Sequence, residues 1–364
     1  MTVRDIFIEY GQEYLNTFWD HVPAHHRKVM QAIIHCRTPY LGAIVCRCEG
    51  CGQTYQIFRS CGNRHCPTCQ GDKAKMWLAR RLDQLLPVNH FMITFTVPAV
   101  FRKFFRSHQR FAYSAFFEAT SGAMRKLASE NTYFQGDIPG FFGVLHTWGR
   151  QMLYHPHIHY IVPGGAFDSN DHSWHSSQPE FYLPIRVLSK LVKHRMYTMM
   201  KKEGFLHLLP PDAWQQDWNV NSQAVGNGER SIRYLAAYVF RTAISDKRVL
   251  DIKDGHVIFR YTDTKTGTEK IMKLKIFEFL RRFLQHVLPR GFMKIRYFGF
   301  MHPSSRITLE VAVAILEAFY GIYRSKKKES NDQSRIPKCS VCNAHVRYLY
   351  FIPPHRLLAS AGFT

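Results

Sequence analysis

Seven of the nine cysteines in this 364-residue chain lie between positions 36 and 69, which constrains how that segment can fold. Two Cys-x-x-Cys pairs, Cys48/Cys51 and Cys66/Cys69, are separated by 14 residues, and glycine closely follows each pair. In a reducing compartment, such crowding favours metal binding over disulfide bonds. Four thiolates at this spacing are typical of a closed tetrahedral site, so we predict that these cysteines hold a structural Zn²⁺.

Further candidate ligands surround these pairs. Cys36, Cys61 and His65 could form a second zinc site, or could exchange with the first set in ways that spacing does not resolve. They could equally be buried thiols and a hydrogen-bonded histidine. Other cysteines and histidines nearby are Cys46, His35, His25 and His26. A closed zinc site would fold about 40 residues that are too few to hold a core of their own.

The chain has a large excess of positive charge. Its 49 lysines and arginines outnumber the 27 acidic residues, which gives a formal net charge of +22. Such an excess is typical of proteins that bind nucleic acid, although a merely basic soluble protein would show it too. Basic residues lie among or beside the cysteines, so we expect the zinc-binding segment to bind DNA. These residues are Arg47, Arg59, Arg64 and Lys73.

The sequence contains no recognisable targeting or membrane segment. The first residues mix charges and lead into no long apolar core, unlike a signal peptide. No apolar run approaches the roughly 18 residues that span a bilayer. We therefore expect a cytoplasmic protein with no membrane partner.

A histidine pair lies in a segment rich in β-branched and aromatic residues, 157–162, which we predict to be a strand. Because strand side chains alternate, His157 and His159 would share one face while Ile158 points into the core. Two imidazoles about 6–7 Å apart on one strand could chelate a divalent ion. The alternative is a pair of surface histidines.

A third ligand is needed to complete such a site. His146, on a predicted neighbouring strand at 141–148, is the first candidate, and His155 is the second. Mg²⁺ prefers oxygen ligands, Mn²⁺ accepts nitrogen and oxygen, and an all-histidine set also suits Zn²⁺. The sequence leaves the identity of the ion open.

A tyrosine pair follows in the segment 229–244, where apolar residues recur with helical spacing. Tyr234 and Tyr238 are four residues apart and would stack on one helix face, away from the apolar stripe. A free phenol, with a pKa near 10, is a poor nucleophile at neutral pH, so a Lewis-acidic metal on a phosphate would assist its attack. Alternatively, the two rings are amphipathic aromatics packed on a sheet.

Basic residues near the tyrosines could hold flanking phosphates. These candidate DNA contacts are Arg233, Arg241, Lys247 and Arg248.

Together these motifs resemble those of the two-tyrosine HUH transposases of the insertion sequence 91 type, over nearly the whole chain. The matching motifs are Cys36-Arg-Thr with Leu41-Gly42, Ser60-Cys-Gly-Asn-Arg-His-Cys-Pro-Thr-Cys-Gln70, Leu145-His-Thr-Trp-Gly149, His155-Pro-His-Ile-His159, Tyr234-Leu-Ala-Ala-Tyr238, Arg241-Thr-Ala-Ile-Ser245 and the stretch 288–299. One departure is Ala237, which precedes the second tyrosine where the family pattern leads us to expect arginine.

The resemblance implies an α+β protein: an N-terminal zinc-binding domain plus an HUH endonuclease domain with a central antiparallel β-sheet flanked by helices. It implies that His157 and His159 bind the catalytic Mg²⁺ or Mn²⁺ and that Tyr234 and Tyr238 are nucleophiles. No ATP would be needed, because the phosphotyrosine bond conserves the energy of the cleaved phosphodiester.

We place the domain boundaries at 1–85 for the zinc-binding domain, 86–300 for the catalytic domain and 301–364 for a C-terminal helical region. The last region carries a separate pair, Cys339 and Cys342, for which His345 and His355 could supply the missing zinc ligands. Its Lys326–Lys328 run fits a solvated linker better than a DNA reader. The expected elements are a helix at 73–86, a strand at 89–97, a helical stretch at 101–129, a polar loop at 168–178, a strand at 217–225, a hairpin at 248–261 and a helix at 308–323.

The expected function is that of a bacterial transposase, which cuts and transfers single-stranded or hairpin DNA through 5′-phosphotyrosine intermediates in rolling-circle transposition. We expect the protein to be associated with the nucleoid, and it could form homo-oligomers. A replication initiator or relaxase would use the same chemistry. A non-catalytic zinc-dependent DNA-binding regulator and a zinc hydrolase are further alternatives, but no carboxylate at motif spacing supplies a general base for the hydrolase.

Overall fold

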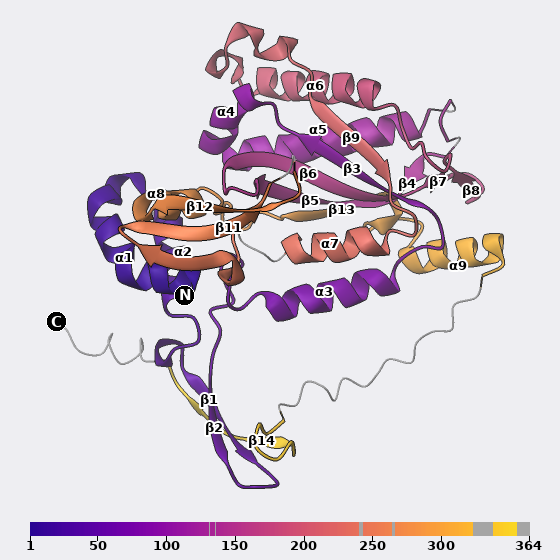
Figure 1. Cartoon of the computed structure of the whole chain (residues 1–364). Helices are drawn as coiled ribbons and strands as arrows, with labels where there is room; N and C mark the ends of the chain where they lie inside the picture. Colours follow the sequence, from indigo (N-terminus) through magenta and orange to yellow (C-terminus); the bar gives the residue numbers. More distant parts are fainter. Residues whose placement is uncertain (131, 135, 240–242, 264–265, 323–337, 355–364) are drawn as a thin grey trace.

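The computed structural model describes residues 1–130, 132–134, 136–239, 243–263, 266–322 and 338–354. Its helices and strands form a mixed α+β body from which a narrow β-ribbon projects (Figure 1). The predicted fold class is therefore confirmed. Short 3₁₀ turns lie at Trp19–His21, Pro39–Leu41, Ala99–Phe101, Leu206–Leu208, Pro211–Gln215, Asp246–Arg248 and Gly299–Met301.

A five-stranded antiparallel sheet forms the centre of the body. Its order is β13-β5-β6-β3-β9, so strands distant in sequence lie side by side. The strands are β3 (His90–Thr96), β5 (Phe141–Trp148), β6 (Tyr154–Pro163), β9 (Asn219–Ala224) and β13 (Ile295–Phe298). Gly143 in β5 lies opposite Tyr160 in β6, and a Cβ at Gly143 would meet that ring, so glycine is required there.

Helices cover both faces of this sheet (Figure 1). One face packs on α4 (Arg102–Ser107), α5 (Gln109–Ala128) and α6 (Ile185–Lys202). The other face packs on α3 (Gly71–Asp83) and α7 (Glu229–Val239). Alternation along β6 sends Ile158 and Tyr160 into the α5 side, so His157 and His159 face the α7 side.

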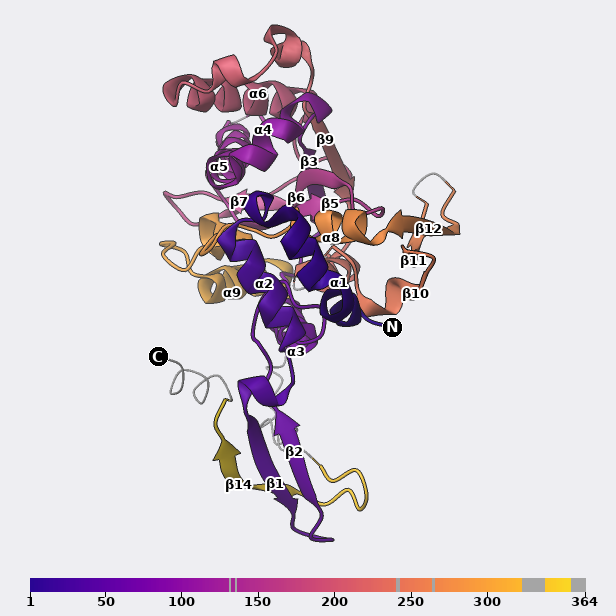
Figure 2. The ribbon, with the colours of Figure 1, turned by 90° about the vertical axis from the view of Figure 1, so that its left-hand side faces the viewer.

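A second packing unit lies at one end of the body, beside the central sheet, and faces the viewer in Figure 2. The helices α1 (Val3–Phe18) and α2 (Ala24–Ile34) pack on α8 (Ile276–Leu284) and on a three-stranded sheet. That sheet contains β10 (Val249–Lys253), β11 (His256–Thr262) and β12 (Glu269–Lys275). A capping box between Thr2 and Asp5 begins α1 by satisfying its first amides.

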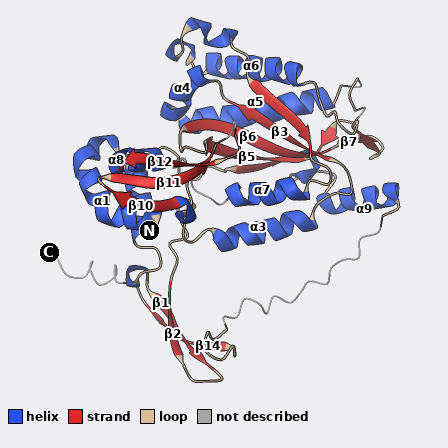
Figure 3. Cartoon of the chain, in the orientation of Figure 1, coloured by secondary structure: helices blue, strands red, loops and turns tan. Residues whose placement is uncertain are grey.

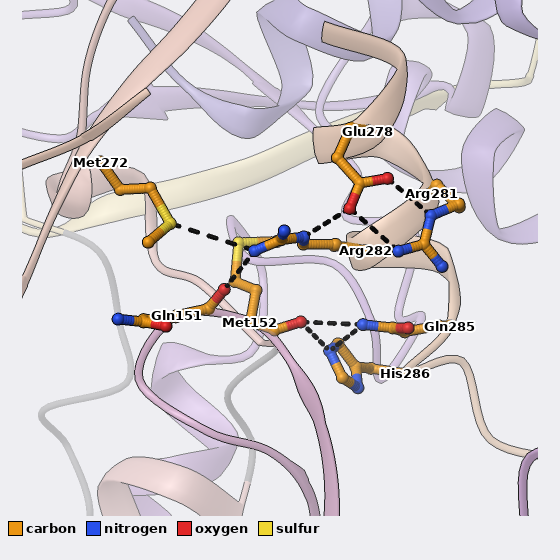
Figure 4. A network of polar contacts seen from close by, with 8 residues as sticks. All are labelled: Gln151, Met152, Met272, Glu278, Arg281, Arg282, Gln285 and His286. Atoms are coloured by element: carbon orange, nitrogen blue, oxygen red, sulfur yellow. Dashed lines mark hydrogen bonds and ion pairs between the residues drawn. The ribbon is translucent and has the colours of Figure 1, made fainter. Parts of the chain in front are cut away.

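The C-terminal end of α8 is fastened to the turn between β5 and β6, the two strands that carry the histidines (Figure 4). Arg282 donates to the carbonyl of Gln151, while Gln285 and His286 both donate to the carbonyl of Met152. Since that Met152 oxygen only accepts, the His286 Nε2 carries the proton and Nδ1 accepts from Thr147. These hydrogen bonds hold the β5–β6 turn against the end of α8.

The projecting ribbon is built from both ends of the sequence (Figure 3). It pairs β1 (Ala43–Cys48) with β2 (Thr54–Phe58) on one side and with β14 (Val346–Ile352) on the other. Strand β14, from the region after residue 300, thus pairs with β1, and α1 and α2, from the region before residue 86, pack on α8.

A small peripheral unit completes the described chain. It comprises β4 (Ile138–Pro139), β7 (Gly165–Phe167), β8 (Trp174–Ser176) and α9 (Leu309–Tyr320). The predicted polar loop at 168–178 therefore includes the strand β8.

The remaining predicted elements appear with shifted ends. The predicted helix at 101–129 is divided at His108, whose backbone leaves helical geometry and separates α4 from α5. The tyrosine helix, predicted to reach 244, is described as far as Val239. The Lys326–Lys328 run lies outside the described residues.

Candidate active site and metal centres

Three histidines meet on the α7 side of the central sheet. The register places His146 of β5 directly opposite His157 of β6, and His159 follows on the same face. Their ring centroids are 4.8–5.3 Å apart, and one ring nitrogen from each lies within 4.8 Å of the others. Of the two predicted third ligands, the structure brings His146 into the group and leaves His155 outside it.

Hydrogen bonds orient two of these rings. His157 Nδ1 lies 2.7 Å from the carbonyl of His155 and must donate to it, which leaves Nε2 as a lone-pair ligand. His159 Nδ1 lies 2.8 Å from the hydroxyl of Thr94, its neighbour across the β3–β6 pairing. The three residues therefore fit a metal centre with three nitrogen ligands.

Burial favours the uncharged form of all three imidazoles. It lowers the pKa of His159 to about 4, and lowers the pKa of His146 and His157 well below the ordinary value. Neutral imidazole is the form that binds metal, so the cluster is ready to bind an ion at neutral pH.

Tyr234 lies beside this cluster. Its ring centroid is 6.4 Å from that of His159, with the two rings perpendicular, and the residue is 44% exposed. Helix α7 places it there because Ile232, Leu235 and Val239 bury the opposite stripe against the sheet. Tyr238 belongs to the same helix, but its side chain lies outside the described part of the structure.

The predicted DNA-contacting cations have different surroundings. Arg233 is exposed and pairs with Glu229 at 2.7 Å, and Lys247 is also exposed. Arg248 is half-buried and donates to the carbonyls of Arg150 and Arg260. Arg241 lies outside the described residues.

Arg64 is also engaged internally. Its guanidinium donates to the carbonyls of Pro289 and Phe292, and so ties the cysteine segment to the loop that leads into β13. A DNA contact by Arg64 would compete with these two hydrogen bonds. Arg47 and Arg59 lie on the projecting ribbon instead, where the Arg59 guanidinium stacks 5.3 Å above the Phe351 ring.

The first cysteine cluster contains Cys36, Cys61, Cys66 and Cys69, with all four sulfurs within 4.8 Å of one another. The predicted ligand His65 is not part of it; its Nε2 instead accepts from the amide of Leu288. This cluster lies at the base of the ribbon and packs within the α1–α2–α8 core.

The second cysteine cluster corrects the predicted zinc set. Cys48 and Cys51 meet Cys339 and Cys342, not Cys66 and Cys69. The Cys48–Cys342 and Cys51–Cys339 sulfur distances are 3.3 and 3.6 Å. The reason is geometric: the strands β1 and β2, six and five residues long and so about 16–20 Å, separate Cys48 and Cys51 from the first cluster.

Among the described residues, the predicted ligand His345 does not join the second cluster. The described group around Cys339 and Cys342 is all cysteine, and His345 contributes only its backbone carbonyl, which accepts from Glu49. His355 lies outside the described residues. Tyr55 lies 2.8 Å from the Cys339 sulfur, and this contact lowers the pKa of Cys339 to about 6. Both tetrads match the donor set and closure of structural zinc sites.

Sequence reasoning missed two residues beside the histidines. Lys294 precedes β13, and its Nζ lies 4.6 Å from the ring centroid of Trp148, which in turn stacks on His146. Burial lowers the pKa of Lys294 to about 7. Both residues fall in stretches that match the family motifs, but nothing in their local pattern distinguishes them from core residues.

None of the helices in the described ranges combines the length and apolar character needed to span a lipid bilayer.

Comparison with known proteins gives consistent matches. The profile of a family described as "Putative transposase" matches residues 140–307, and the profile "Transposase zinc-binding domain" matches residues 6–97. The chain is 37% identical over 320 residues to "Putative transposase y4qJ" of Sinorhizobium fredii (strain NBRC 101917 / NGR234), covering 82% of this chain and 80% of that protein. It is 26% identical over 306 residues to "Transposase for insertion sequence element IS801" of Pseudomonas savastanoi pv. phaseolicola, covering 79% and 72%. No solved structure matches it.

Proposed function

We propose, from the premise that the chain belongs to the insertion sequence 91 family of transposases, that it cuts and rejoins single DNA strands with tyrosine nucleophiles. The observation that carries this proposal is the position of Tyr234, whose ring centroid lies 6.4 Å from that of His159 in the histidine cluster. The wider role is movement of an element by rolling-circle transposition, with DNA as the substrate.

The residues that would hold a catalytic ion are His146, His157 and His159. Their ligand nitrogens lie close enough to share one ion, and Thr94 and the His155 carbonyl hold two of the rings in place. When bound, a divalent ion such as Mn²⁺ or Mg²⁺ would act as a Lewis acid on the scissile phosphate.

In the cleavage step, the Tyr234 hydroxyl oxygen attacks the phosphorus. A bond forms between this oxygen and phosphorus, and the bond from phosphorus to the 3′ oxygen breaks. The net proton transfer is from the phenol to the leaving 3′ oxygen. The products are a 5′-phosphotyrosine and a free 3′-hydroxyl, and attack by a 3′-hydroxyl on the phosphotyrosine reverses the step without an external energy source.

Tyr238 is the second nucleophile in this proposal. One helical turn separates it from Tyr234, so a second strand can be cut while the first remains attached. The exposed Arg233 and Lys247 are available to hold flanking phosphates after rearrangement of the Arg233–Glu229 ion pair. Arg241 follows in sequence as a further candidate.

The two cysteine clusters hold structural zinc and present basic surface to DNA. Arg47 and Arg59 lie on the ribbon, which projects from the catalytic body (Figure 2). A single-stranded or hairpin substrate would contact both the ribbon and the histidine face.

Covalent trapping tests this proposal. Full-length zinc-loaded protein would be incubated with Mn²⁺ and end-labelled single strands spanning the DNA that flanks its coding sequence. We expect a denaturation-resistant protein–DNA adduct that Tyr234→Phe reduces at least tenfold and Tyr234→Phe/Tyr238→Phe abolishes. Tyr197→Phe, at an exposed tyrosine on α6, is the matched control and should leave the adduct unchanged.

An undiminished adduct in the double variant would show that the nucleophile lies elsewhere. Metal-stimulated binding without any adduct would favour the non-catalytic DNA-binding regulator. A replication initiator or relaxase would form the same adduct, but it would not excise and insert a defined element.

A further inference from the structure

The strand register of the projecting ribbon decides which side chains share each of its two faces. Residues directly opposite each other in an antiparallel pair lie on the same face, and so do alternate residues of one strand. Arg47 of β1 lies opposite Arg347 of β14. Two positions away on β1, Val45 lies opposite Tyr350, because one extra residue in β14, Leu349, shifts the register there. These two cross-strand pairs therefore share one face, which we call the arginine face.

The arginine face places two cations side by side without an acid between them. Arg47 and Arg347 are both exposed, and neither forms an ion pair with any described residue. Like charges directly opposite each other, with Cβ atoms about 4.5–5.5 Å apart, destabilise a sheet. The acidic residue of the segments 43–59 and 338–354 is Glu49, in the β1–β2 turn. An anion such as a phosphate, bound between the two guanidinium groups, would replace this repulsion by charge-assisted hydrogen bonds.

An exposed aromatic ring lies next to the arginines on the same face. The side chain of Tyr350 is 55% exposed, and its ring stacks on no other ring of the described structure. A phosphate held by the arginines would leave a base of the same strand within reach of this ring. Phosphate-binding cations combined with a stacking ring are typical of single-strand sites. In a duplex, neighbouring bases already cover the faces that the ring would need.

The other face of the ribbon has its aromatic rings engaged within the protein. The Tyr55 hydroxyl lies 2.8 Å from the Cys339 sulfur, and the Arg59 guanidinium covers the Phe351 ring. Tyr348 of β14 is 58% exposed on this face, away from the pair of arginines. One strand thus offers two equally exposed tyrosines on opposite faces, which allows a matched comparison.

We propose that the arginine face binds single-stranded DNA, with Arg47 and Arg347 on one phosphate and Tyr350 stacked on a neighbouring base. This assignment rests on the proposed function for the choice of DNA as the partner, and adds the form of the DNA and the side chains that hold it. The profile "Transposase zinc-binding domain" ends at residue 97, so it contains only one of these three residues. Strand β14, which the second cysteine cluster joins to β1, completes the surface.

DNA binding without cleavage tests the assignment. A fluorescein-labelled strand of about 12 thymidines, and a mixed-sequence duplex of the same length, would be titrated with full-length zinc-loaded protein without added Mn²⁺ or Mg²⁺. Tyr350→Ala should weaken binding of the single strand at least fivefold and binding of the duplex less than twofold. Arg47→Ala/Arg347→Ala should reduce the slope of log affinity against log salt by about 0.7 for the single strand, which corresponds to one phosphate contact.

Two control variants separate the arginine face from the rest of the surface. Tyr348→Ala removes an equally exposed ring from the other face of β14. Arg186→Ala removes an exposed arginine on α6, at the opposite end of the molecule from the ribbon (Figure 2). Both should leave the affinity for the single strand within twofold of that of the unsubstituted protein. Zinc content and melting temperature would confirm that each variant is folded.

Equal losses for Tyr350→Ala and Tyr348→Ala would overturn the assignment, as would an unchanged salt slope in the arginine variant. An equal loss of duplex and single-strand binding in Tyr350→Ala would show that the ring does not stack on an unpaired base. If the expected losses are found but no covalent adduct forms with Mn²⁺, the proposed function fails while the arginine face stands. An adduct together with unaltered binding in the variants would give the reverse.

Discussion

The two cysteine clusters share one donor set but differ in how the chain builds them. The first cluster draws all its ligands from positions 36–69 and packs inside the α1–α2–α8 core. The second joins Cys48 and Cys51 to Cys339 and Cys342 at the ribbon, with a small core of its own. The same zinc chemistry thus supports the body in one place and closes a projecting ribbon in the other.

This difference predicts that the clusters contribute unequally to folding. Cys66→Ser should destabilise the body by more than about 4 kcal/mol, because it removes a structural zinc from a buried site. Cys342→Ser should leave the main thermal transition within a few degrees while lowering bound zinc from two ions to one. Calorimetry and zinc analysis of the two variants measure this, and equal destabilisation by both would contradict it.

The amino-acid sequence predicts the location of the first cysteine cluster, within residues 36–69, better than it predicts the ligands of the second cluster. The Cys-x-x-Cys pairs predict zinc binding, but every pair is chemically alike, so spacing favoured joining Cys48/Cys51 to Cys66/Cys69. The real partner of Cys48/Cys51 depends on the pairing of β14 with β1, across nearly 300 residues. A local pattern carries no information about such a distant strand pairing.

The histidine face was predictable because it depends on local periodicity. Strand alternation alone places His157 and His159 together, and helical spacing sets Tyr234 apart from the apolar stripe. The contacts of Lys294 with Trp148 and of Arg64 with two backbone carbonyls were not predictable, because each joins segments that are distant in the sequence. Non-local contacts of this kind require the assembled fold.

A second prediction compares two arginines that the sequence treats alike. Arg64→Ala should cost about 2 kcal/mol of unfolding free energy, because two backbone carbonyls lose a charged donor. Arg47→Ala, on an exposed part of the ribbon, should change stability by less than about 0.5 kcal/mol. Urea denaturation measures the unfolding free energy of both variants. Similar losses for the two would show that Arg64 does not stabilise the contact between the cysteine segment and the loop before β13.

A third prediction concerns the loss of folding stability at acidic pH, which we attribute to a buried histidine in the body of the molecule. Burial lowers the pKa of His286 to about 3. Between pH 6.5 and pH 3, this imidazole is therefore protonated in the unfolded chain but neutral in the folded chain. Stability should therefore fall as the pH drops from 6.5, by about 1.5 kcal/mol at pH 5 for this histidine. His286→Asn should remove that contribution, and an unchanged pH slope in the variant would count against it.

The smallest expected effect concerns the ribbon. Tyr55→Phe removes the hydroxyl beside the Cys339 sulfur and should weaken zinc retention at the second cluster by about tenfold. Competition with a chelator measures this as faster loss of one of two zinc ions. Loss of both ions together would mean that the clusters are not independent.

Identification of the residue that carries covalent DNA tests the central claim most directly. Trypsin cleavage after Arg233 and Arg241 releases both tyrosines in one eight-residue peptide, so tandem mass spectrometry of the trapped adduct can separate Tyr234 from Tyr238. We predict a nucleotide remnant on Tyr234 in the unsubstituted protein. A remnant confined to any residue outside that peptide would contradict the assignment of the histidine cluster and α7 as the active site.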